Sequence, residues 1–225
     1  MSTPDLFSRL RAAGSDHWSA YVNHAFVEQL AAGSLPESCF RHYLLQDYVF
    51  LIHYSRAWAL ACYKADNLAD MRSAAGLLHG LMDHEMSLHI GYCKRWGISQ
   101  DQLEQTKETR ANMAYTRYVL ERGMAGDALD LLVALSPCVL GYAEIGRQRI
   151  AHPATRLDGN PYRDWLEMYA DQEMQQLAAS VAAQMQRLAE QRMGEGRFDR
   201  LLHTFIDATQ LEIGFWDMGL NPEQP

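Results

Sequence analysis

The sequence has little of what nucleic-acid binding or membrane insertion would require. Its 225 residues carry 20 Lys and Arg against 28 Asp and Glu, a formal net charge of −8. A chain with this acidic balance lacks the basic face that neutralises phosphates, so we expect no nucleic-acid partner. We find no apolar run approaching the roughly 18 residues of a membrane helix and expect no membrane contact. A hydrophobic share of 48% excludes a disordered chain and predicts a soluble globular protein.

Cysteine pairs are also missing. The four cysteines are scattered, with no C-x-x-C spacing and no histidine at zinc-finger distance, which indicates reduced thiols. They are Cys39, Cys62, Cys93 and Cys138. The N-terminal segment reaches a charged residue at Asp5 and again at Arg9, leaving no room for the apolar core of a secretory signal. We therefore expect a cytoplasmic protein.

Glycine and proline are scarce, with 15 and 7 residues, and they separate long stretches instead of recurring at the short intervals of a β-sandwich. Apolar residues follow the three-to-four spacing of helices in most of these stretches. We find no linker and no internal repeat. The sequence therefore predicts one all-α domain over residues 1–225, a bundle of about seven helices. The expected spans are 4–31, 37–64, 67–95, 101–123, 126–150, 160–192 and 195–218.

The span 131–150 is apolar nearly all round, which predicts a central helix surrounded by others. Pro137 removes one backbone hydrogen bond there, and the resulting kink should leave backbone groups from Leu135 to Cys138 unsatisfied. Cys138 should be presented unusually, with Tyr142 on the same face. A thiol is a nucleophile only when it is deprotonated or paired with an acid–base group. Cys138 is thus either a nucleophile with a partner on another helix or a small core residue.

Two carboxyl groups fall on or beside apolar helical faces. Asp47 interrupts an inward stripe, so it either binds a polar ligand or pairs with a basic residue such as Arg41 or Arg56. Glu212 borders the stripe of the last span, next to Phe215. Facing inward, it would be desolvated and would suit proton transfer near neutral pH. Facing outward, it would be an ordinary edge glutamate.

Aromatic residues crowd the same faces. A flat heteroaromatic ligand would need such walls, although an ordinary helical core uses the same residues. The set comprises Tyr48, Phe50, Tyr54, Tyr115, Tyr142, Tyr169, Phe215 and Trp216.

The run from Asp83 to His89 raises the possibility of a metal site. Its histidines, His84 and His89, are five residues apart and point in different directions, unlike those of H-E-x-x-H. Glu85 and His89 share a face, but the paired Glu-x-x-His motifs of di-iron bundles are missing. We therefore expect a solvated face here and no metal.

Four segments together carry a recognisable pattern: FRHYLLQDYVFLIHYSRAWALACYKA (40–65), ALSPCVLGYAEIGRQ (134–148), NPYRDWLEMYADQEM (160–174) and FIDATQLEIGFWDMG (205–219). In these segments the chain resembles the TenA, or thiaminase II, family of aminopyrimidine aminohydrolases, which has a haem-oxygenase-like helical fold. The resemblance covers essentially the whole chain. It implies hydrolysis of 4-amino-5-aminomethyl-2-methylpyrimidine to the hydroxymethyl compound and ammonia in thiamin salvage, with thiamin a further substrate of some members. It also implies a homotetramer that needs no cofactor.

Carried over by position, the resemblance implies that Cys138 is the nucleophile and Glu212 its acid–base partner. Asp47 and Tyr142 would hydrogen-bond the edge of the aminopyrimidine. The other implied site residues are the ring walls Phe50, Tyr115 and Phe215 and the polar lining residues Tyr54 and Tyr169.

Two positions depart from the family pattern and bear on substrate range. Phe50 stands where many members have tyrosine, and Val-Leu-Gly follows Cys138 where relatives often carry a larger aromatic residue. Two other functions stay open. One is an oxidase or oxygenase of the same fold that uses iron or haem, with His24 or the Glu85 and His89 pair as ligands. The other is a thiamin-related binding or regulatory protein without turnover.

Overall fold

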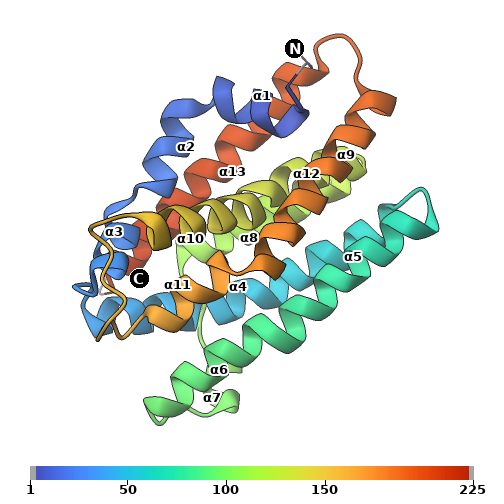
Figure 1. The fold of residues 1–225 in the computed structure, drawn as a ribbon. Helices are drawn as coiled ribbons and strands as arrows, with labels where there is room; N and C mark the ends of the chain where they lie inside the picture. The colour runs from blue at the N-terminus through green and yellow to red at the C-terminus, as the bar shows by residue number, and fades with distance from the viewer. Residues whose placement is uncertain (1–3, 223–225) are drawn as a thin grey trace.

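The computed structural model describes residues 4–222, apart from the side chain of His84. The first three and last three residues of the domain expected over 1–225 lie outside the described residues. Between residues 4 and 222 all regular structure is helical (Figure 1), which confirms the all-α prediction. The elements are α1 (Leu6–Ala13), α2 (Ser15–Val22), α3 (Ala25–Ala32), α4 (Glu37–Lys64), α5 (Leu68–Gly80), η1 (Leu81–Glu85), α6 (Met86–Arg95), α7 (Gln100–Glu104), α8 (Arg110–Ala125), α9 (Ala128–Ser136), η2 (Pro137–Gly141), α10 (Tyr142–Ala151), α11 (Arg163–Ala170), α12 (Gln172–Arg192) and α13 (Arg197–Leu220).

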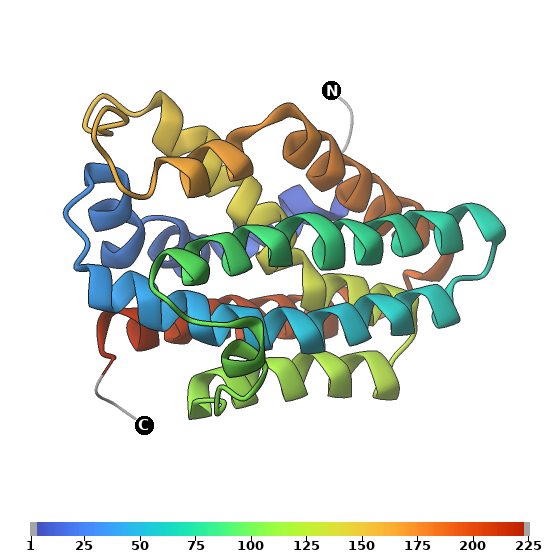
Figure 2. The ribbon, with the colours of Figure 1, turned by 90° about the horizontal axis from the view of Figure 1, so that it is seen from below.

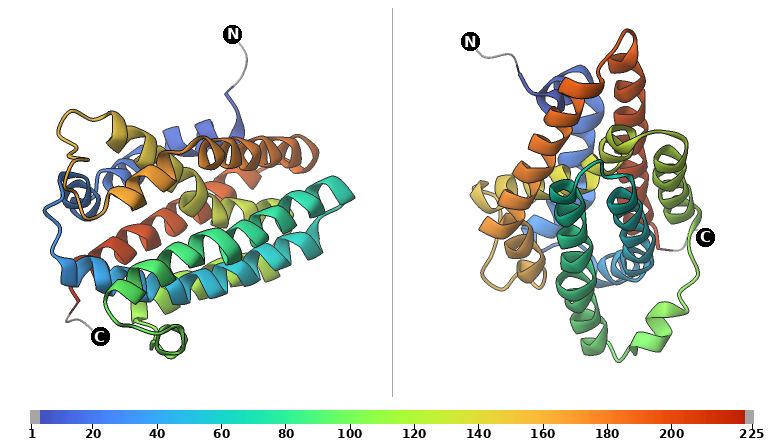
Figure 3. Two further views of the ribbon diagram at one scale, coloured as in Figure 1. Left: turned by 60° about the horizontal axis from the view of Figure 1, so that its bottom comes forward. Right: turned by 90° about the vertical axis from the view of Figure 1, so that its right-hand side faces the viewer.

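Long helices that lie side by side form the frame of the molecule. Helix α5 continues through the π-helical segment η1 into α6 as one rod, and Figure 2 shows this rod alongside α4. Helix α13 crosses the middle of the molecule in the left view of Figure 3 and packs against α4, α8 and α9. The site described below lies where these helices meet η1 and η2.

Three of the expected spans are divided by new helix starts. The span 4–31 breaks into α1, α2 and α3, because Gly14 ends the first helix and His24 caps the third, with Nδ1 accepting a hydrogen bond from the Phe26 amide. The span 101–123 divides because the Thr109 hydroxyl caps α8, and 160–192 divides because Asp171 caps α12. The sequence predicted helical content correctly here and missed these internal caps.

The helix predicted to be central is the continuous α9–η2–α10 rod. It spans 24 residues and contains an 18-residue window with a mean hydropathy of 1.6, so it is long and apolar enough to cross a membrane by composition. The expectation that no segment reaches that length is therefore wrong. However, 83% of the window is buried inside the protein, as in the core helix of a bundle.

Candidate active site

Cys138 lies in the π-helical segment η2, which begins at Pro137. Proline has no amide hydrogen to donate to the carbonyl four residues earlier, that of Val133. The hydroxyl of Ser136 donates to this carbonyl oxygen instead, at 2.8 Å. The backbone irregularity predicted at Pro137 is thus present as a π segment, a feature that recurs at functional sites.

Two tyrosines bind the carbonyl groups around this irregularity. Tyr54 of α4 donates its hydroxyl to the Leu135 carbonyl at 2.9 Å, and Tyr21 of α2 donates to the Pro137 carbonyl at 3.2 Å. These two carbonyl groups therefore have hydrogen-bond partners, although the sequence predicted that they would be unsatisfied. Because both tyrosines come from other helices, they fix the orientation of the segment that carries Cys138.

Gly141 is the small residue at the end of the Val-Leu-Gly stretch that follows Cys138, and the packing around it explains why no larger residue stands there. A Cβ atom at this position would lie 2.2 Å from Cε1 of Tyr21. The space that a larger side chain could fill is therefore taken up by the Tyr21 ring, which is fully buried.

The thiol of Cys138 is kept protonated by its surroundings. Burial raises its pKa well above the usual value, and the nearby carboxyl groups of Glu212, Glu85 and Asp47 raise it further. A hydrogen bond with Tyr54 acts in the opposite direction. Cys138 therefore needs a proton acceptor at the moment it attacks, and the candidates are the carboxyl groups whose charges influence its pKa.

Glu212 faces inward from α13, as one of the two sequence interpretations required. Its side chain is 2% exposed, and the Tyr115 hydroxyl donates to Oε1 at 2.8 Å. Burial raises the pKa of Glu212 to about 8. At neutral pH this carboxyl group is mostly protonated, which suits a general acid.

Asp47 is 3% exposed, and its side chain is held by a tyrosine and a histidine instead of by an arginine. The Tyr43 hydroxyl donates to Oδ2 at 2.9 Å, and Nε2 of His89 lies 2.7 Å from the same oxygen. The expected alternative of an ion pair with Arg41 or Arg56 is therefore wrong.

His89 is fully buried, so the solvated face predicted for it and Glu85 is also wrong. Its Nδ1 lies 2.8 Å from the backbone oxygen of Glu85, and since a carbonyl only accepts, Nδ1 is the donor. Burial lowers the pKa of His89, but its hydrogen bond to Asp47 and the charges of Asp47 and Glu85 raise it overall. The pair therefore favours an imidazolium facing the Asp47 carboxylate.

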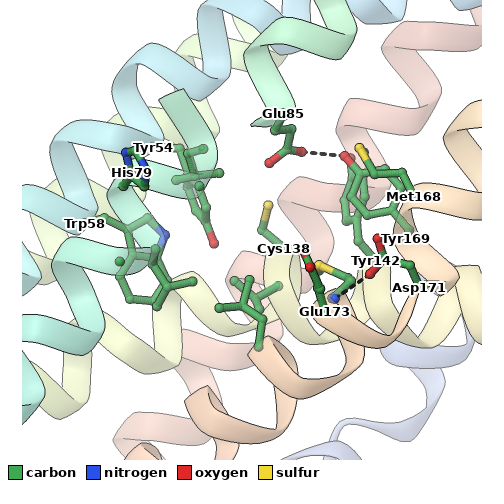
Figure 4. Close-up of a pocket in the computed structure, with 17 residues that line it drawn as sticks. Tyr54, Trp58, His79, Glu85, Cys138, Tyr142, Met168, Tyr169, Asp171 and Glu173 are labelled. Carbon is green, nitrogen blue, oxygen red and sulfur yellow. Dashed lines mark hydrogen bonds between the residues drawn. The ribbon is translucent and has the colours of Figure 1, made fainter. Parts of the chain in front are cut away.

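A cavity of about 300 Å³ opens beside Cys138. Four of the predicted site residues line it, namely Tyr54, Cys138, Tyr142 and Tyr169, together with Glu85 from η1. Figure 4 shows the Cys138 sulfur pointing into the open space between Tyr54 and Glu85. Most of the remaining wall is apolar and comes from α5, η1, α11 and α12, including Leu77, Leu81, Met168, Met174 and Leu177.

The other five predicted residues form a second, fully packed group that does not line the cavity: Asp47, Phe50, Tyr115, Glu212 and Phe215. The ring of Phe50 connects them, with its centroid 5.2 Å from Tyr54, 5.0 Å from Tyr115 and 5.5 Å from Phe215. Tyr54 thus belongs to the cavity wall and contacts the packed group. The structure brings all nine predicted residues into one region.

Sequence reasoning missed four residues of this region. Tyr43 and His89 hold Asp47, Tyr21 supports η2, and Glu85 lines the cavity. The sequence did show Tyr43 one turn before Asp47 and Glu85 on the face of His89. Nothing local, however, indicated that the η1 segment turns this face toward α4.

The histidines considered as iron or haem ligands make other contacts. Both ring nitrogens of His89 are engaged, and those of His24 contact the Phe26 amide and Asp217. Within the described residues, no group of three His, Cys, Asp or Glu side chains is arranged to hold a metal ion.

The chain is similar to proteins of known family. Residues 11–222 match the model of the TENA/THI-4/PQQC family. An aminopyrimidine aminohydrolase of Halalkalibacterium halodurans is 37% identical over 206 residues, which cover 91% of this chain and 90% of that protein. A crystal structure from Silicibacter, described as a TenA family transcription regulator, is 49% identical, covers 96% of this chain and 97% of its own, and superposes with a TM-score of 0.91.

A more distant structure, from Shewanella denitrificans, is described as a domain of unknown function with a heme oxygenase-like fold. It is 14% identical, covers 97% of this chain and 93% of its own, and has a TM-score of 0.68, so it informs on the fold alone. The predicted haem-oxygenase-like fold is thus confirmed. The match over residues 11–222 also confirms the resemblance stated from the sequence: the chain belongs to the TENA/THI-4/PQQC family.

Proposed function

We propose that this protein is an aminopyrimidine aminohydrolase of the thiaminase II type, acting in thiamin salvage. Its substrate is 4-amino-5-aminomethyl-2-methylpyrimidine, and its products are the hydroxymethyl compound and ammonia. The observation that supports the proposal is that Glu212 of α13 is near enough to Cys138 of η2 to raise its pKa, in an aromatic region beside a cavity. The named aminohydrolase relative covers nearly the same length of chain and supports the substrate class.

The residues around Cys138 match the groups that an aminopyrimidine presents. In the imidazolium pair with His89, Asp47 is a carboxylate that can accept a hydrogen bond from the exocyclic amino group. The Tyr142 hydroxyl lies 3.4 Å from that of Tyr43, which donates to Asp47, so it can bind the same edge of the ring. The rings of Phe50, Tyr115 and Phe215 lie behind the cavity wall, so the heterocycle would reach their flat faces only if that wall moves on binding.

The chemistry follows from the protonation states of these groups. Glu212 donates its proton to a ring nitrogen, and the carboxylate that remains takes the proton of the Cys138 thiol as the sulfur forms a bond to a ring carbon. Electrons of the adduct then expel the amine from the adjacent methylene carbon. Water adds to that carbon, the carbon–sulfur bond breaks, and the ring becomes aromatic again. When the sulfur leaves, Glu212 returns a proton to it and takes back the proton of the ring nitrogen, so Cys138 and Glu212 carry the bond changes at the ring.

The cavity beyond Cys138 has room for a leaving group larger than ammonia. Its apolar wall from α5, α11 and α12 would contact such a group. We therefore propose intact thiamin as a second substrate to be tested beside the aminomethylpyrimidine.

The decisive experiment measures ammonia release from the aminomethylpyrimidine. Cys138→Ala should lower kcat by several orders of magnitude, because no other thiol lines the cavity. Glu212→Gln should lower it by about 10²–10⁴-fold, the usual contribution of an acid–base group. Cys62→Ala is the matched control, since Cys62 is also a free, partly buried thiol but lies outside the cavity.

Unchanged turnover in both site variants would disprove the Cys138 and Glu212 mechanism. Tight binding of the pyrimidine without ammonia release by the unchanged protein would show a binding or regulatory protein instead.

We also propose a cytoplasmic homotetramer. The four cysteines are free thiols, in keeping with a reducing compartment. Light scattering should give a mass four times that of the 25.6 kDa chain; a monomeric mass would contradict the tetramer.

A further inference from the structure

Glu85 is a carboxyl group beside Cys138 that the reaction above leaves unused. It stands on the cavity wall at the end of η1, and Figure 4 shows it across the open space from Tyr54, with the Cys138 sulfur between them. The Tyr169 hydroxyl donates to Oε1 at 2.5 Å. Its other oxygen, Oε2, makes no hydrogen bond to the described residues and is free to meet a molecule in the cavity.

The backbone presents Glu85 in the same way as it presents Cys138. The described chain has two π-helical segments, and each carries one reactive side chain of the cavity: η1 holds Glu85 and η2 holds Cys138. Such segments recur at functional sites because they turn side chains away from regular helical positions. Both sides of the cavity thus carry a group that can take part in proton transfer.

The surroundings of Glu85 keep both of its protonation states accessible. Burial and the charge of Asp47 raise its pKa to about 7, while His89 and the Tyr169 hydrogen bond oppose that rise. No lysine or arginine lines the cavity to hold it as a permanent carboxylate. The titratable groups that face Glu85 or share its cavity are Asp47 and Tyr54 of α4, His79 of α5, His89 of α6, Cys138 of η2, Tyr142 of α10, Tyr169 of α11, and Asp171 and Glu173 at the start of α12.

The proposed reaction needs a second base. Once Glu212 has given its proton to the ring, a base must also remove a proton from the water that attacks the methylene carbon. Glu212 is buried in the packed group, does not line the cavity and must recover its own proton from the ring. Glu85 lines the cavity itself, where its carboxyl group can contact a water molecule beside Cys138.

Resting on the proposed function, we propose that Glu85 is a second catalytic group, the base for the attacking water. Its carboxylate removes one proton from water as the oxygen bonds to the methylene carbon, the ring electrons shift back and the bond to the Cys138 sulfur breaks. Glu85 then passes this proton to the ammonia released earlier. The aminomethyl group, protonated at neutral pH, and one water molecule thus give the hydroxymethyl group and ammonium.

Two variants separate this role from a structural one. Glu85→Gln keeps an acceptor for Tyr169 and loses the base, so kcat should fall by about 10²–10⁴-fold with little change in KM or Tm. Glu85→Asp keeps a carboxyl group in the cavity but draws it back from Tyr169, so it should retain more of the turnover than Glu85→Gln does. A purely structural Glu85 would give the reverse order, with Tm and KM moving together.

The pH profile gives a second readout. In the unchanged protein kcat should fall as the pH drops through about 7, because Glu85 becomes protonated. This acid limb should disappear in Glu85→Gln and remain in Glu167→Gln, which removes an exposed carboxyl of α11 outside the cavity.

Glu85→Gln with undiminished kcat, or with the acid limb retained, would overturn the assignment even if Cys138→Ala is inactive. If the unchanged protein releases no ammonia at all, the proposed function fails, and the role of Glu85 fails with it.

Discussion

Glu212, whose raised pKa suits proton transfer, also lowers the free energy of unfolding as the pH rises. The pKa of Glu212 is raised by burial from 4.5 to about 8, so the folded state holds its proton more tightly than the unfolded chain does. The stabilisation from this proton is complete below the unfolded pKa and is lost as the pH rises through about 8. A buried acid of this kind is retained for its chemistry at a cost in stability.

We therefore predict that Glu212→Gln gains stability relative to the unchanged protein between pH 4.5 and about 8. The difference in unfolding free energy should grow with pH to a few kcal/mol at most, since one pKa unit corresponds to about 1.4 kcal/mol. Tm measured by circular dichroism across this range tests it. Glu167→Gln, at an exposed carboxyl of α11, should show no such trend, and a constant Tm difference for Glu212→Gln would contradict a buried, protonated carboxyl.

At the scale of elements, the sequence predicts one of the two π-helical segments and not the other. Pro137 predicted the irregularity in η2, because a missing amide hydrogen is visible in the sequence. No residue in Leu81–Glu85 predicts η1 in that way, so Glu85 and His89 were assigned to solvent. Asp47 stood out as a polar interruption in an apolar stripe, but its partner His89 comes from α6 and only the fold brings the two together. The long-range roles of the other site residues came from family resemblance, since periodicity alone also fits an ordinary core.

Gly141 provides a test of η2 as an element. In Gly141→Ala the new Cβ would lie 2.2 Å from the buried ring of Tyr21, so the ring or the segment must shift. Overpacking of this kind costs about 1–3 kcal/mol, and a shifted Tyr21 would lose its bond to the Pro137 carbonyl. We predict a lower Tm and a loss of turnover larger than the stability change explains. Gly91→Ala in α6, where a Cβ meets no atom within 4 Å, should keep both or raise Tm slightly.

At the scale of the whole molecule, the site joins helices that are distant in the sequence. Asp47 belongs to α4, Cys138 to η2 and Glu212 to α13; Asp47 and Glu212 are buried, and Cys138 packs against the hydrophobic core. A ligand bound among them contacts elements from most of the chain. Such a ligand should therefore stabilise the fold as a unit, because it binds the folded state and not the unfolded chain.

We predict that the hydroxymethylpyrimidine product raises Tm in proportion to the logarithm of its concentration. At about 100 times Kd the stabilisation is about 2.7 kcal/mol, which for a chain of this length is a Tm rise of roughly 5–10 °C. In Asp47→Ala the same rise in Tm should need a much higher ligand concentration, because the amino group of the pyrimidine loses its acceptor. Cys138→Ala should keep most of the rise in Tm. If Asp47→Ala and the unchanged protein show the same rise in Tm, Asp47 serves only to hold His89, and the pyrimidine binds away from Asp47.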